Sequence, residues 1–64
     1  MNINKYLQVT GISANAFADK IGEDSQKVYY WIKRDANVEL EPGGGMTITL
    51  TKEVYSGPAV MGAD

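Results

Sequence analysis

The chain has 64 residues, with six basic and eight acidic side chains and a formal net charge of -2. It contains no cysteine and no histidine, which excludes disulfides, Cys/His zinc sites, thiol nucleophiles and histidine-dependent triads. The longest apolar run, 29–32, is far shorter than the ~20 residues of a membrane helix, and the N-terminus lacks the apolar segment of a signal peptide. We therefore expect one small cytoplasmic domain, not an enzyme, that uses no metal, no cofactor and no membrane.

Residues 1–34 carry the signals of three helices. The third helix should bury Val28, Trp31 and Ile32, because these side chains fall on one face at helical spacing. Polar capping residues precede each apolar pattern, and glycines follow the first two. The expected N-caps are Asn2 or Asn4, Ser13 and Asp24, and the expected stops are Gly11 and Gly22.

After residue 35 the apolar period changes from about 3.6 to 2. The alternating runs 37–41 and 46–51, joined by the glycine-rich segment 42–45, predict a β-hairpin that packs on the helices. The small, unpatterned residues after 55 predict disorder. The expected fold is α+β, with three short N-terminal helices, a β-hairpin and a flexible C-terminal tail. Residues 1–55 form the domain and 56–64 the disordered tail.

The segment 14–33 has the pattern of a helix-turn-helix. Ala18 is small where the next helix crosses, and Gly22 permits the left-handed backbone of a tight turn. Glu23 departs from the pattern, because an apolar residue usually packs inward at this position.

A helix-turn-helix places its second helix, here 25–34, in the major groove of DNA. Gln26, Tyr30 and Lys33 point away from the buried stripe, and a glutamine can bond adenine bidentately. Asp24 either accepts from a cytosine amine or only caps the helix. The aromatic pair 29–30 suits a groove or a protein partner equally. The candidate DNA-binding residues are Asn15, Ser25, Gln26, Lys27, Tyr29, Tyr30, Lys33 and Arg34.

Residues 3–55 resemble the Cro-type repressors of temperate phages, of the mixed α+β lambda Cro kind. The resemblance is strongest at Ala18, Gly22 and Val28 and continues through the hairpin 37–51. It implies a sequence-specific transcriptional repressor from a phage or prophage, acting on double-stranded operator DNA in a bacterial host cell. The family's basic tail is missing, since 56–64 contain no lysine or arginine.

The resemblance also implies a homodimer that pairs the strand 46–51 of each copy and exchanges an anchor near its end. A thin core favours oligomerisation independently. The expected dimer-interface residues are Met46, Ile48, Leu50, Val54 and Tyr55.

Two alternatives remain open. The acidic balance and the aromatic run 29–31 are also compatible with a small phage-type protein-interaction module or inhibitor, similar to anti-CRISPR proteins, on the same scaffold. The hairpin after residue 34 also resembles the wing of excisionase-like architectural DNA-binding proteins, in which 43–45 would approach DNA.

Overall fold

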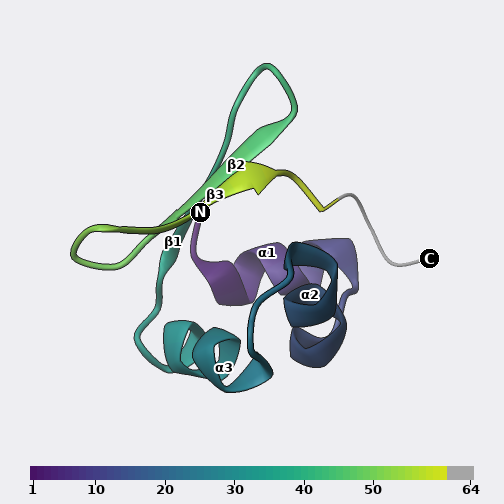
Figure 1. The fold of residues 1–64 in the computed structure, drawn as a ribbon, viewed down its shortest axis with the longest axis vertical. Coiled ribbons are helices and arrows are strands. Elements are labelled where there is room, and N and C mark those ends of the chain that lie inside the picture. Colours follow the sequence, from purple (N-terminus) through teal and green to yellow (C-terminus); the bar gives the residue numbers. More distant parts are fainter. Residues whose placement is uncertain (61–64) are drawn as a thin grey trace.

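The first half of the chain forms three short helices. The computed structural model describes residues 1–60. Each helix begins at a side-chain oxygen that accepts a backbone N–H of the first turn, and the caps are Asn2, Ser13 and Asp24, as predicted. The helices are α1 (Ile3–Thr10), α2 (Ala14–Ile21) and α3 (Ser25–Lys33), shown in Figure 1.

The second half forms one antiparallel sheet. Its first two strands make the predicted hairpin, with Val38 opposite Ile48 and Leu40 opposite Met46. A third strand pairs with the other side of the second and places Tyr55 opposite Ile48. The strands are β1 (Asn37–Leu40), β2 (Gly45–Thr49) and β3 (Glu53–Pro58), in the order β1-β2-β3. The predicted α+β class, with helices first and a hairpin after them, is confirmed.

The third strand is the main departure from the sequence prediction. β3 continues to Pro58, inside the segment expected to be disordered. The backbone N–H of Ala59 then donates to the carbonyl of Gly44 at 2.9 Å, which extends the pairing beyond the strand. Small residues fit here because the Tyr55 ring lies across Gly57: a Cβ at Gly57 would come within 2.5 Å of the Tyr55 hydroxyl.

The chain then returns to the helices. Val60 is buried, and its carbonyl accepts a hydrogen bond from the hydroxyl of Tyr6 in α1. The prediction of a disordered tail from residue 56 is therefore wrong for 56–60, because strand pairing and the burial of an apolar side chain hold this segment on the domain. The rest of that prediction, 61–64, lies outside the described residues.

The predicted dimer edge is also corrected. β2 is the central strand of the sheet, so its backbone is paired on both sides and offers no free edge. Met46 and Ile48 are 0% exposed inside the protomer, and they have no surface to offer a second copy. Leu50, Val54 and Tyr55 are half-buried against the same core, and the last two lie on the edge strand β3.

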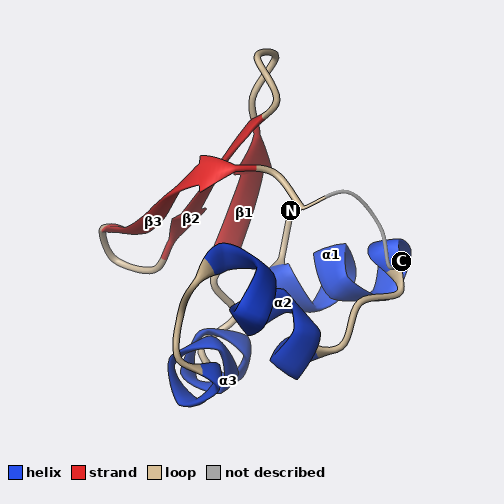
Figure 2. Ribbon diagram, turned by 45° about the vertical axis from the view of Figure 1, so that its right-hand side comes forward, coloured by secondary structure: helices blue, strands red, loops and turns tan. Residues whose placement is uncertain are grey.

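One core joins the two halves. The sheet lies on one side of the three helices (Figure 2). The largest fully buried side chains come from both layers, and Tyr6 meets Phe17 edge-to-face with ring centroids 5.9 Å apart. These side chains are Trp31, Phe17, Ile3, Met46, Ile48, Val28 and Val38. No buried side-chain polar atom among residues 1–60 lacks a hydrogen-bond partner.

Candidate nucleic-acid interface

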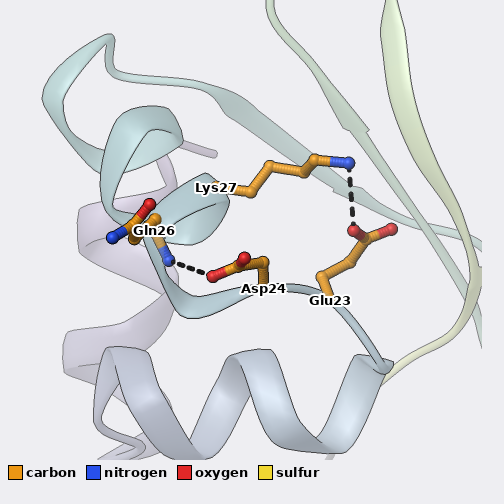
Figure 3. Close-up of polar contacts among 4 residues, drawn as sticks. All are labelled: Glu23, Asp24, Gln26 and Lys27. Carbon is orange, nitrogen blue, oxygen red and sulfur yellow. Dashed lines mark hydrogen bonds and ion pairs between the residues drawn. The ribbon is translucent and has the colours of Figure 1, made fainter.

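The α2–α3 unit has the local geometry of a helix-turn-helix. Gly22 ends α2 with φ 74°, a left-handed conformation that an L side chain adopts only with strain. The N–H of Glu23 then donates to the carbonyl of Ala18 at 2.9 Å, which closes the end of the helix. Ala18 is 2% exposed, as its predicted place at the helix crossing requires. α2 and α3 cross instead of running side by side (Figure 3).

Glu23 does not disturb the turn, although its position is usually apolar. Its carboxylate is half-buried and pairs with the Lys27 ammonium at 3.2 Å, one helical turn further on (Figure 3). The predicted i, i+4 pair is therefore present. This is the only ion pair among residues 1–60. Lys27 is predicted to contact phosphate, and it meets a carboxylate of its own chain instead.

Asp24 acts as the N-cap of α3. Its Oδ1 accepts the backbone N–H of Gln26 at 2.9 Å, so one carboxylate oxygen is committed to the helix (Figure 3). Its negative charge also lies at the positive end of the helix dipole, where it is stabilising. Of the two roles predicted for Asp24, capping is the one that the structure displays.

The outward face of α3 is open to solvent. Val28 is 0% and Trp31 2% exposed on the inner face, whereas Tyr29 and Tyr30 are 52% and 50% exposed. Among the predicted DNA-binding residues, six are exposed on α3 or at its end: Gln26, Lys27, Tyr29, Tyr30, Lys33 and Arg34. Ser25 is half-buried in the first turn, and Asn15 is exposed at the start of α2. α3 thus presents a connected polar and aromatic face.

The C-terminal end of α3 carries two cations. The Arg34 Nη1 donates to the Tyr30 hydroxyl at 3.3 Å, and the guanidinium carbon lies 5.7 Å from the Tyr30 ring centroid. This contact restrains both side chains on one face of the helix. Lys33 is exposed beside them. Asp35, the next residue, turns towards α1, where its Oδ1 accepts from Asn2 at 3.2 Å.

The outer face of the sheet carries carboxylates, in contrast to the two cations at the end of α3. Strand register places Glu39 beside Thr47 and Ser56, on the face opposite the buried residues. Glu41 is also exposed, and its Oε2 accepts a hydrogen bond from the Thr47 hydroxyl at 2.9 Å. Glu53 adds a further carboxylate as the first residue of β3. This face therefore carries a local negative charge, which repels a polyanion.

Residues 43–45, the predicted approach of an excisionase-like wing, lie far from α3. β1 starts three residues after α3 and runs away from it, so the turn after β1 is at the distant end of the sheet (Figure 1). The turn at the same end of the sheet as the start of β1 is the next one, between β2 and β3. The sequence pattern predicted the turn 42–45, but it did not predict β3 and therefore not the turn between β2 and β3.

No match to this chain is found among models of known protein families, curated proteins or solved structures. No helix within residues 1–60 is long and apolar enough to cross a membrane. In the same residues, no group of three or more carboxylates is placed to hold a metal ion.

Proposed function

We propose that this protein is a sequence-specific DNA-binding transcriptional regulator of the Cro-like repressor type. The observation that carries the proposal is the open outer face of α3, held by a helix-turn-helix whose turn, cap and buried inner face all have the required geometry. The N-terminal part of such a helix enters the major groove. The acidic outer face of the sheet supports the same orientation, because it leaves the helical side as the face that DNA can approach.

In this arrangement the residues of α3 divide into two roles. Gln26, exposed in the first turn, donates to and accepts from an adenine edge. Tyr29 and Tyr30 offer ring surface to thymine methyl groups and hydroxyls to phosphates. Lys33 and Arg34, at the other end of the helix, pair with phosphates, which position the protein without reading sequence.

A homodimer is part of the proposal, and the corrected topology changes where it forms. β3 is paired on one side only, so pairing between copies uses β3 and not β2. Val54 and Tyr55, two of the predicted interface residues, lie on this strand. A two-fold dimer would place its two recognition helices in half-sites about one helical turn apart.

A protein-interaction module is the second candidate, and one observation favours it. The segment 19–35, which spans the turn and α3, contains four basic and four acidic residues, so its formal charge is zero. Two tyrosines, each about half exposed, stand at the centre of its open face. Tyrosine is enriched in protein interfaces, and a neutral surface gains little from phosphate neutralisation.

The deciding experiment compares two triple variants with matched chemistry. Gln26→Ala/Tyr30→Ala/Lys33→Ala removes the α3 face, and Lys5→Ala/Gln8→Ala/Val9→Ala removes exposed residues of similar type from α1. A site is first selected from a pool of randomised duplexes, and its affinity is measured by fluorescence anisotropy against a scrambled duplex. We expect the α3 variant to lose on the order of 100-fold in affinity for the site, and the α1 variant to lose little.

Equal losses in both variants, or no enrichment of any sequence from the pool, would overturn the proposal. In the second case, a complex with a cellular protein that survives nuclease treatment and high salt would favour the interaction module.

A further inference from the structure

The turn between β2 and β3 lies at the same end of the sheet as the C-terminal end of α3. Thr49, the last residue of β2, is paired with Asn37, the first residue of β1, which follows α3 after three residues. The chain after Thr49 is therefore at the same end of the sheet as the end of α3. Figures 1 and 2 both show this turn on the side of the molecule where α3 lies.

The turn, 50–52, is held in a defined shape. The backbone N–H of Leu50 donates to the carbonyl of Lys52 at 3.1 Å. Leu50 is half-buried against the core, whereas Thr51 and Lys52 are exposed. The core therefore anchors one residue of the turn and leaves a hydroxyl and an ammonium group at its tip.

Lys52 is the only basic residue after Arg34 in the whole sequence. It stands in the β2–β3 turn, at the same end of the sheet as the end of α3 that carries Lys33 and Arg34. The helix itself has few uncommitted cations, because Lys27 is paired with Glu23 and only Lys33 and Arg34 follow it. Much of the affinity of a DNA-binding protein comes from phosphate neutralisation, so a further cation beside the helix has a large relative effect.

We propose that the turn 50–52 is a second DNA-backbone contact, in which Lys52 pairs with a phosphate flanking the groove that α3 enters. Thr51 supplies a hydroxyl donor to the same backbone. Glu53, adjacent to Lys52 and exposed, opposes the contact electrostatically. This inference rests on the proposed function, because it adds a contact to DNA that α3 binds.

The test is the salt dependence of binding to duplex DNA for three single variants. Lys52→Ala should weaken binding to the selected and the scrambled duplex by the same factor and lower the slope of log affinity against log salt by about 1. Between about 50 and 200 mM salt the wild type should therefore lose about 3.5-fold more affinity than this variant. Glu53→Gln should change affinity in the opposite direction, most strongly at low salt.

Lys5→Ala is the control for the loss of one positive charge, since Lys5 lies on the side of α1 opposite its buried residues. It should leave the slope unchanged. A Lys52→Ala slope equal to that of the wild type would overturn this inference and leave the role of α3 intact. If the wild type does not bind duplex DNA at all, the proposed function fails, and this inference fails with it. Circular dichroism at each salt concentration confirms that the variants are folded.

Discussion

The helical half and the sheet half share one core but differ in the charge they present to solvent. Residues 1–34 contain five basic and three acidic side chains, whereas 35–64 contain one basic and five acidic ones. In the structure this difference along the chain becomes a difference between two sides of the molecule, because the sheet lies on one side of the helices (Figure 2). A chain with an acidic total can thus keep one face that a polyanion approaches.

One basic residue, Lys52, does not follow this division between a basic and an acidic half. Lys52 is in the acidic half, yet the β2–β3 turn lies at the same end of the sheet as the end of α3. The acidic residues at the start of α3 are likewise engaged locally, Asp24 with a backbone amide and Glu23 with Lys27. Net charge therefore describes this molecule poorly, and the position of each charge relative to α3 matters more.

The largest expected effect comes from weakening the core that the two halves share. Phe17 is 0% exposed and contacts Tyr6, so Phe17→Ala should lower the free energy of unfolding by about 3–5 kcal/mol. Far-ultraviolet circular dichroism and Trp31 fluorescence should then report one shared transition at lower denaturant concentration. Val9→Ala, at a position 65% exposed, is the control and should change stability little. Two separate transitions would show that the halves fold independently.

Substitutions at two glycines with the same backbone conformation can distinguish an effect on stability from an effect on DNA binding. Gly11 and Gly22 both have φ 74° at the end of a helix, and a Cβ at either would meet no atom within 4 Å. Gly11→Ala and Gly22→Ala should therefore each cost about 1–2 kcal/mol of stability, measured by chemical denaturation. Only Gly22→Ala strains the turn between α2 and α3, so it alone should also weaken DNA binding. Equal losses of binding would argue against the α2–α3 unit as the recognition element.

The smallest expected effect concerns the hydrogen bond between α1 and the end of the described chain. Tyr6→Phe removes the donor to the Val60 carbonyl and should cost about 1 kcal/mol. Burial raises the pKa of the Tyr6 hydroxyl above its ordinary value of 10.0. The folded protein thus holds the proton more tightly than the unfolded chain, and its stability should fall as the pH rises above about 10.

The measurement is the free energy of unfolding from about pH 8 to 11 for the wild type and for Tyr6→Phe. The difference between the two proteins should shrink above about pH 10, because only the wild type has this proton to lose. A difference that stays constant over this range would contradict the burial of the Tyr6 hydroxyl.

The accuracy of the sequence predictions follows the range of the interactions. The caps Ser13 and Asp24 and the left-handed Gly22 depend on contacts within a few residues, and all three were predicted correctly. The exposed face of α3 followed from its buried stripe for the same reason. The hydrogen bond between Thr47 and Glu41 joins residues six positions apart, which is already beyond that range, and no local pattern indicated it.

The formation of β3 depends on interactions with residues that are distant in the chain or that show no apolar pattern in the sequence. In β3, a Cβ at Gly57 would come within 2.5 Å of the Tyr55 hydroxyl, and the chain after the strand is bonded by Tyr6, which is 54 residues from Val60 in the chain. Alternation is also interrupted by an irregular register between Ile48 and Thr49. A strand that contains small residues and a bulge, here at Val54, resembles a loop in sequence. The misplaced dimer edge followed directly from this missing strand.

The most direct test of the account is a titration of the isotope-labelled protein with a short duplex that contains the selected site, followed by amide NMR shifts. We expect the perturbed amides to cluster in 25–34 and in the turn 50–52, and the outer face of the sheet, at Glu39, Thr47 and Ser56, to be unaffected. Perturbations centred on that outer face, or none anywhere at saturating duplex concentrations, would contradict the assignment of α3 as the DNA-binding element.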